Sequence, residues 1–194
     1  LMETVTPQLG VEYAKNFGIT TLTDTDMNAA TALGGITNGV TNLELTSAFA
    51  SIANGGLYTK PVFFTKILDH DGKLLIDNEP ETHRVLKDST AFLLTDAMED
   101  SMQPNHIFAS SGVSVSSTST RAALPNMSAA GKSGTTSNNN DIWFIGYTPY
   151  YTAGVWGGCD ENQKLTAQNG GTSFHKDIWR KIMTRVHEGL SDPG

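Results

Sequence analysis

The chain is organised around one stretch, Gly131-Lys132-Ser133-Gly134-Thr135-Thr136. This stretch sets a cation, three hydroxyls and two glycines in a row. A polar connection over 137–141 follows it, and then comes the apolar run Ile142 to Tyr147. This order predicts a strand, a short connection and a second strand of the same sheet.

The two faces of the first predicted strand carry different side chains. Successive strand residues face opposite sides, so Lys132 and Gly134 share one face, and Ser133 and Thr135 share the other. Gly134 weakens a strand, and a strand glycine often marks a place where another backbone comes close. An extended peptide could therefore lie against this edge, with an ammonium and hydroxyls near its terminal carboxylate.

The triplet Lys132-Ser133-Gly134 by itself also fits two other structures. One is an ordinary strand start whose lysine is solvated. The other is a phosphate-binding loop, because Gly131-Lys132-Ser133 ends like G-x-x-x-x-G-K-[ST]. That loop needs a glycine where Asn126 stands and a strand before it, whereas Leu124-Pro125-Asn126 is typical of a turn.

The composition excludes several classes of protein. The 194 residues are enough for one compact domain with a real core, or for part of one. The net charge is −7, and Lys and Arg form no cluster, which argues against a nucleic-acid surface. No apolar run approaches about 18 residues, so we expect no membrane span in this chain. The five histidines show no metal-ligand spacing such as H-x-x-x-H.

Capping residues and apolar periodicity predict four helices, over about 6–17, 41–53, 88–103 and 173–187. Asp88 is expected to cap the third helix. In the last helix, Ile178, Ile182 and Val186 repeat every four residues and are expected to face the sheet.

Two hairpins are also expected. The apolar runs Pro61 to Leu68 and Lys73 to Ile76 lie on either side of a polar segment, and Asp71-Gly72 is typical of a hairpin turn. The second hairpin joins 142–147 to 151–157, and its residues Trp143 and Trp156 are expected to pack beneath helices. Asp24 and Asp26 are interpreted as turn or cap residues, and the hydroxyl-rich segment 108–120 as a loop.

Three runs resemble the end of the transpeptidase domain of penicillin-binding proteins, particularly the bifunctional class A kind. They are Ala130-Gly-Lys-Ser-Gly-Thr-Thr, Asp141-Ile-Trp-Phe-Ile-Gly-Tyr-Thr-Pro and Tyr151-Thr-Ala-Gly-Val-Trp-Gly-Gly. In that family the third signature is K-[ST]-G, which follows S-x-x-K and S-x-N. The resemblance covers nearly the whole chain in family order. It departs at Ser117-Thr118-Ser119, where the family usually has a glycine-threonine-glycine turn.

The resemblance implies an α/β fold of the α+β type. This is a mostly antiparallel sheet flanked by helices, like the serine β-lactamase and penicillin-binding transpeptidase fold, and incomplete in this chain. Residues 1–194 would be the C-terminal part of a single transpeptidase domain.

The implied activity is D,D-transpeptidation of peptidoglycan stem peptides through a serine acyl enzyme. Lys132 and Thr135 would be catalytic. The substrate would be bound by Ser133, Gly134, Thr135 and Thr136. The hydroxyls of Ser133 and Thr135 would hold its carboxylate, and Gly134 would permit its close approach. β-Lactams would react as substrate mimics, and neither a metal nor an organic cofactor is required.

The nucleophile motif is the part of the family pattern that the sequence lacks. Ser173-Phe-His-Lys176 is its S-x-x-K match, but it follows the K-S-G triplet and falls in the last predicted helix. Ser137-Asn138-Asn139 fits S-x-N but lies directly after the signature. We interpret both as coincidental matches, and we expect the first two motifs on a segment outside this chain.

The expected partners are therefore the stem peptide, β-lactams and the N-terminal remainder of the same transpeptidase domain, without nucleic acid. We expect an extracytoplasmic location, with the membrane reached through a segment absent from this chain. The alternative is a nucleophile-free module of the same fold that binds wall peptides or serves a structural purpose. The isolated chain is predicted to be inactive.

Overall fold

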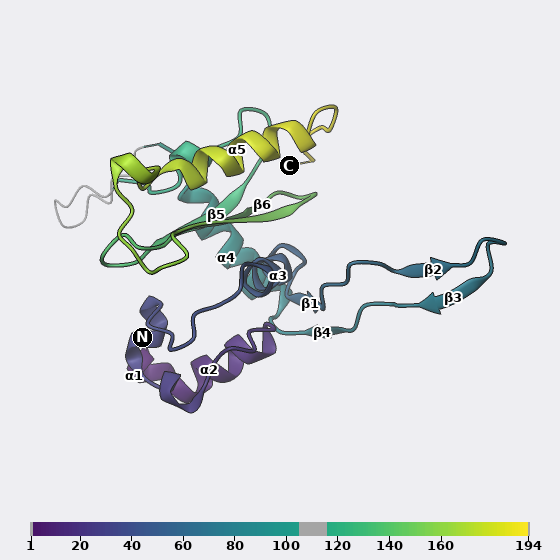
Figure 1. Ribbon diagram of the computed structural model, residues 1–194, viewed down its shortest axis with the longest axis horizontal. Helices are drawn as coiled ribbons and strands as arrows, with labels where there is room; N and C mark the ends of the chain where they lie inside the picture. Colours follow the sequence, from purple (N-terminus) through teal and green to yellow (C-terminus); the bar gives the residue numbers. More distant parts are fainter. Residues whose placement is uncertain (1, 105–115, 194) are drawn as a thin grey trace.

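An antiparallel sheet between helices forms the centre of the computed structural model, which describes residues 2–104 and 116–193 (Figure 1). The sheet consists of β5 (Ala130–Thr135), β6 (Ile142–Tyr147) and β7 (Thr152–Gly157), in the order β5-β6-β7. The predicted strand, connection and second strand are therefore confirmed. Every strand pair in the described residues is antiparallel, as the fold-class prediction required.

Helices cover both faces of this sheet. The long C-terminal helix α5 (Phe174–Val186) lies along one face, and α3 (Asn42–Ala53) and α4 (Asp88–Asp100) lie on the other (Figure 1). The cluster on the α5 side contains Met102, Ala122, Ala129, Phe144, Trp179 and Met183. The cluster on the α3 and α4 side contains Ile52, Ala91, Met98, Ala130 and Tyr147.

The predicted sheet-facing stripe of α5 is wrong. His175, Trp179 and Met183 form the buried stripe of α5, and Trp179 and Met183 pack in one cluster with Phe144 of the sheet, whereas the predicted stripe that includes Ile178 is exposed. Both stripes repeat every four residues, so periodicity alone does not separate them. The choice follows from shape, because Trp179 fills the space above Gly146, where a Cβ would come within 2.8 Å of the indole.

The N-terminal part forms a smaller layer beneath α3. It contains α1 (Met2–Val5), α2 (Pro7–Asn16) and the 3₁₀ turns η1 (Asp24–Asp26) and η2 (Ala29–Leu33). Its core consists of Val11, Ile19, Leu22 and Ala48. Asp26 is buried at the end of a capping box, so its interpretation as a cap residue is confirmed.

A two-stranded arm projects sideways from the body (Figure 1). Its outer part pairs β2 (Lys66–Leu68) with β3 (Leu74–Asp77), as predicted, and Gly72 takes a positive φ of 80° in the connecting turn. Its base pairs β1 (Leu57–Thr59) with β4 (Thr82–Arg84), a pairing that was not predicted from the sequence.

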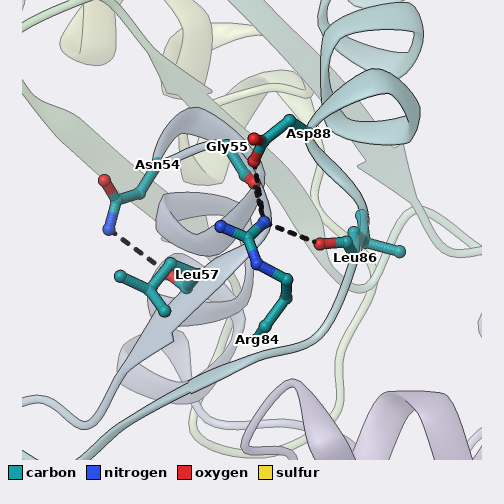
Figure 2. A network of polar contacts seen from close by, with 6 residues as sticks. All are labelled: Asn54, Gly55, Leu57, Arg84, Leu86 and Asp88. Carbon is teal, nitrogen blue, oxygen red and sulfur yellow. Dashed lines mark hydrogen bonds and ion pairs between the residues drawn. The ribbon is translucent and has the colours of Figure 1, made fainter.

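Arg84 joins this base to two helices (Figure 2). Its Nη1 lies 2.8 Å from the carbonyl oxygen of Gly55, just after α3, and 3.0 Å from that of Leu86. The same nitrogen lies 2.7 Å from Oδ1 of Asp88 in the first turn of α4. The prediction that Asp88 caps α4 is wrong, because Lys87 occupies the N-cap position and the Asp88 carboxylate binds Arg84 instead.

Two further 3₁₀ turns complete the described elements, η3 (Thr120–Ala122) and η4 (Ala167–Asn169). Most of the predicted hydroxyl-rich loop, residues 108–115, lies outside the described residues. In the part of the chain that is described, no helix has the length and apolar character needed to cross a membrane.

Candidate active site

The predicted substrate strand is an edge strand. In the described residues, β5 pairs only with β6, and its other side carries no strand. Figure 1 shows β5 at the border of the sheet, close to α4. An edge strand offers unpaired backbone groups to an extended peptide, so β5 has the arrangement that peptide binding requires.

The backbone of β5 alternates between pairing with β6 and facing the open edge. The carbonyl oxygen of Gly131 accepts a hydrogen bond from Ser101 Oγ at 3.0 Å, and that of Ser133 accepts one from Lys132 Nζ at 2.7 Å. Both carbonyls therefore point away from β6. Because backbone direction in an antiparallel ladder repeats every two residues, the N–H of Thr135 also points toward the open edge.

The hydroxyls of Ser133 and Thr135 lie on the α5 face of β5. Ser133 stands opposite Phe144, and Thr135 opposite Ile142, and both of these β6 side chains are buried on that face. Within the described residues, neither hydroxyl takes part in a hydrogen bond. These two hydroxyls are free to bind a ligand at the strand edge.

Thr136 has a different environment from the other predicted site residues. Its Oγ1 accepts hydrogen bonds from the N–H groups of Asn140 at 3.0 Å and Asp141 at 2.9 Å. Its own N–H donates to the carbonyl oxygen of Asp141 at 3.1 Å. The side chain thus closes the connection to β6 and fixes the end of the candidate site.

The two glycines of the signature are needed for different reasons. At Gly131 a Cβ would come within 2.8 Å of both the carbonyl oxygen of Ile145 and the ring of Phe144, so packing excludes a side chain. At Gly134 the nearest atom to a Cβ would be Cβ of Trp143 at 3.4 Å, an ordinary contact. Packing in the described residues therefore does not require glycine at position 134. The absence of a side chain there leaves the strand open on the face that carries Lys132.

Lys132 and Lys176 are close enough for their charges to affect each other. Lys132 is exposed, and on the neighbouring elements Lys176 Nζ donates to the carbonyl oxygen of Thr118 at 2.7 Å. Burial lowers the pKa of Lys176, and the charges of Arg121 and Lys132 lower it further. Arg121 is itself paired with Asp177. Lys176 therefore lies near other cations, and its ammonium group bonds Thr118 and not Ser173. This contact is consistent with our interpretation of Ser173-Phe-His-Lys176 as a coincidental match to S-x-x-K.

A buried imidazole lies in the first turn of α5. His175 is almost fully buried, and neither of its ring nitrogens has a hydrogen-bond partner in the described part of the chain. Burial lowers the pKa of His175 to about 4, and the neighbouring charge of Lys176 contributes to this shift. The imidazole is therefore neutral at physiological pH.

The candidate site follows the edge of a strand. Two cavities of about 330 and 240 Å³ occur in the described residues, and residues 131–136 line neither of them. The larger lies between the end of α4 and the segment 123–129, and the smaller lies beside 148–152. In residues 2–104 and 116–193, no group of three His, Cys, Asp or Glu side chains could hold a metal ion.

A family model described as the penicillin binding protein transpeptidase domain matches residues 9–184. The chain belongs to this family. The phosphate-loop alternative for the Lys132-Ser133-Gly134 triplet is therefore excluded, since the triplet lies in a strand of a transpeptidase fold.

Curated relatives agree with this assignment. Penicillin-binding protein 1A of Clostridium acetobutylicum is 31% identical over 94% of this chain and 21% of its own length. Penicillin-binding protein 1A of Aquifex aeolicus is 33% identical over 96% of this chain and 24% of its own length. The chain thus spans about a fifth to a quarter of the length of the penicillin-binding proteins that it matches.

Solved structures confirm the penicillin-binding transpeptidase fold. Penicillin-binding protein 1A from Haemophilus influenzae matches 100% of this chain and 32% of its own, with a TM-score of 0.80 and 22% identity. PonA1 from Mycobacterium tuberculosis, solved in complex with penicillin V, matches 97% of this chain and 52% of its own, with a TM-score of 0.75 and 24% identity.

Long-range polar contacts that no local sequence pattern marked occur at β5 and on other elements of this transpeptidase-family chain. Ser101 donates to the carbonyl oxygen of Gly131 in β5, whereas Arg121 pairs with Asp177, and Lys176 donates to Thr118. Their sequence separation from their partners is 30 residues or more. No local pattern marks such residues, because only the folded chain brings them together.

Proposed function

We propose that this chain supplies the K-S-G side of a serine D,D-transpeptidase that cross-links peptidoglycan stem peptides. The observation that carries the proposal is the arrangement of β5. The N–H of Thr135 faces the open edge, the hydroxyls of Ser133 and Thr135 are unengaged, and Lys132 stands exposed beside them. Membership of the transpeptidase family supports the same reaction class.

Each of these groups has a role in acyl transfer. The terminal carboxylate of the donor peptide is bound by the hydroxyls of Ser133 and Thr135, next to the charge of Lys132. When a serine attacks the penultimate D-Ala carbonyl, the Thr135 N–H stabilises the oxyanion. A donor of this kind lowers the barrier by about 3 kcal/mol, because it is aimed at charge that appears only in the transition state.

The reaction then proceeds in two steps. The serine oxygen forms an ester with the acyl carbon, and the terminal D-Ala leaves with a proton on its nitrogen. An amine of a neighbouring strand attacks this ester, forms the new amide bond and returns the proton to the serine oxygen. β-Lactams mimic the donor and leave a slowly hydrolysed ester.

The nucleophile comes from outside the 194 residues in this proposal. The relatives are four to five times longer than the stretch they share with this chain, and in the proposal residues 1–194 form the C-terminal part of one transpeptidase domain. The N-terminal remainder then covers exposed apolar side chains such as Phe92 and Leu93 of α4. The complete enzyme works outside the cytoplasm and is held at the membrane by a segment beyond this chain.

Fluorescent penicillin tests the proposal. The polypeptide that carries this chain is expected to take the label covalently, whereas the 194-residue chain alone is not. Replacing Lys132 with Ala is expected to slow labelling at least about tenfold without unfolding the protein, because this side chain is exposed. Lys181→Ala, on the exposed face of α5, is the matched control and should label normally.

Two outcomes would contradict this assignment. Covalent labelling of the isolated 194 residues would show that the nucleophile lies within them. Failure of the parent polypeptide to label, together with retained binding of stem peptide, would favour the alternative of a nucleophile-free peptide-binding module.

A further inference from the structure

Three side chains at one end of the candidate site form a cluster that the proposed chemistry does not use. Trp143 of β6 pairs with Gly134 on one side and with Trp156 of β7 on the other. Asp141 precedes Trp143 by two residues. Strand alternation therefore places the carboxylate and both indoles on the face that also carries Lys132.

The cluster is held together by direct contacts. Trp156 Nε1 donates a hydrogen bond to Asp141 Oδ1 at 3.0 Å, and the two indole rings lie 6.3 Å apart at an angle of 52°. Trp156 is 40% exposed, so the expectation that it packs beneath a helix is wrong. In the described residues α3 covers the sheet around Gly154, through Asn42 and Thr46, and leaves this end of the face open.

The carboxylate retains unused hydrogen-bonding capacity. A carboxylate has two oxygens and can accept several hydrogen bonds. Among the described residues, the Trp156 indole is the donor that reaches the Asp141 side chain, and no donor reaches Oδ2. An anion with a free oxygen beside two indole rings offers an ammonium group a charge partner together with aromatic surface.

The position of the cluster connects it to the acyl-transfer site. Thr136 and Asp141 are joined by two hydrogen bonds between the ends of β5 and β6. The row of Lys132 and the row of Asp141 are four residues apart along the strands, which corresponds to about 13 Å. Lys132, which attracts the donor carboxylate, is therefore well separated from the Asp141 carboxylate. Each of the two charged groups can bind a different ligand.

We propose that Asp141, Trp143 and Trp156 form a subsite for the alkylammonium group of the acyl acceptor. The identity of this ligand rests on the proposed function, in which an amine takes the acyl group. A primary alkylamine carries a proton at neutral pH, so the species that first meets the enzyme is a cation. The subsite collects this cation next to the strand that holds the donor peptide.

Acyl transfer by the parent polypeptide provides the first test. Asp141→Asn keeps an oxygen for the Trp156 N–H and removes only the charge, while Asp160→Asn removes an exposed carboxylate just beyond β7 as the matched control. For a peptide acceptor with a primary amine, Asp141→Asn should raise KM about tenfold. Penicillin labelling and transfer to hydroxylamine, which is largely neutral at pH 7, should not change. An unaltered KM for the cationic acceptor would overturn the proposal.

A binding measurement tests the subsite without relying on catalysis. Titration of the same polypeptide with n-butylammonium chloride should change tryptophan fluorescence, whereas n-butanol and sodium chloride should not. Asp141→Asn and Trp156→Phe should weaken this binding several-fold, and Asp160→Asn should leave it intact. This result would support the subsite even if the parent failed to label with penicillin. Equal fluorescence responses of wild type and Asp141→Asn would overturn the proposed subsite. This outcome is also expected if another part of the polypeptide covers the two indoles, and it would overturn the subsite in that case too.

Discussion

Gly134 of β5 lies directly opposite Trp143 of β6, and a Cβ at position 134 would rest 3.4 Å from the Cβ of Trp143. This distance is an ordinary van der Waals contact, so the described part of the fold accepts a side chain there. Gly131, three residues earlier in the same strand, has no such space. The two glycines therefore differ: Gly131 is required by packing, whereas Gly134 leaves the strand edge accessible.

Alanine substitutions at these two glycines should therefore affect different properties, stability at Gly131 and penicillin acylation at Gly134. Gly131→Ala forces a Cβ against the Ile145 carbonyl and the Phe144 ring, and should destabilise the parent polypeptide by about 1–3 kcal/mol. Gly134→Ala should leave the stability within about 1 kcal/mol of wild type but slow penicillin acylation at least tenfold. Denaturant unfolding and labelling kinetics measure the two effects. Normal acylation of Gly134→Ala would remove the glycine from the site.

Arg84 is expected to matter more for stability than its partner Asp88. The Arg84 guanidinium binds the carbonyls of Gly55 and Leu86 as well as the carboxylate (Figure 2). The ion pair itself is exposed on both sides and contributes little, whereas hydrogen bonds from a charged group to the carbonyls contribute more.

Arg84→Ala should accordingly lower the free energy of unfolding by about 1–2 kcal/mol, and Asp88→Asn by less than about 1 kcal/mol. Urea denaturation of the two variants measures the difference. A larger loss for Asp88→Asn would show that the ion pair, and not the carbonyl bonds, joins α3 to α4.

The sequence predicted the strands that carry the candidate residues better than it predicted the packing around them. The bounds of β6 agree with the predicted apolar run Ile142 to Tyr147, because polar and proline residues limit that run on both sides. The faces of the β5 side chains also followed from strand alternation, which placed Ser133 and Thr135 on one face. These features depend on neighbours in sequence, and local rules describe them well.

Features that depend on distant contacts were missed or wrong. In α5, the buried stripe was determined by the fit of Trp179 over Gly146, more than 30 residues earlier in the chain, and not by periodicity. The packing of Trp156 was expected beneath a helix, but its indole bonds Asp141 at an open end of the sheet. Tertiary shape decided both cases, and single-sequence patterns carry no information about it.

His175 predicts a loss of stability in mild acid. Burial, together with the charge of Lys176, holds its pKa at about 4 in the folded chain, whereas an unfolded histidine titrates near about 6.5. Between these values the unfolded state binds the proton and the folded state does not. Stability should therefore fall as the pH drops from about 6.5 to about 4.

Thermal unfolding between pH 7.5 and 4.5 measures this effect. His175→Leu replaces the buried imidazole with an apolar side chain that does not titrate, and should remove much of the decline. His70→Gln, at the exposed turn of the β2–β3 arm, is the matched control and should retain it. If His175→Leu declines like wild type, another group causes the acid sensitivity.

Asp26 predicts a second pH dependence, at lower pH. Its carboxylate accepts hydrogen bonds from the N–H groups of Thr23 and Thr37, both at 2.7 Å, and from their hydroxyls at 3.0 and 2.7 Å. The backbone hydrogen bonds from Thr23 and Thr37 lower the pKa of Asp26 to about 2. Its stabilising contribution is present above the unfolded pKa of about 3.9 and is lost as the pH falls through about 2.

Asp26→Asn should therefore lower Tm at pH 7, because an amide nitrogen cannot accept the hydrogen bonds that one carboxylate oxygen now receives. The difference from wild type should shrink as the pH falls from about 4 to about 2, where the native carboxyl also gains a proton. Asp24→Asn changes the same charge at an exposed neighbouring position and should leave Tm nearly unchanged. A Tm difference that stays constant down to pH 2 would mean that the four hydrogen bonds do not depend on the charge of Asp26.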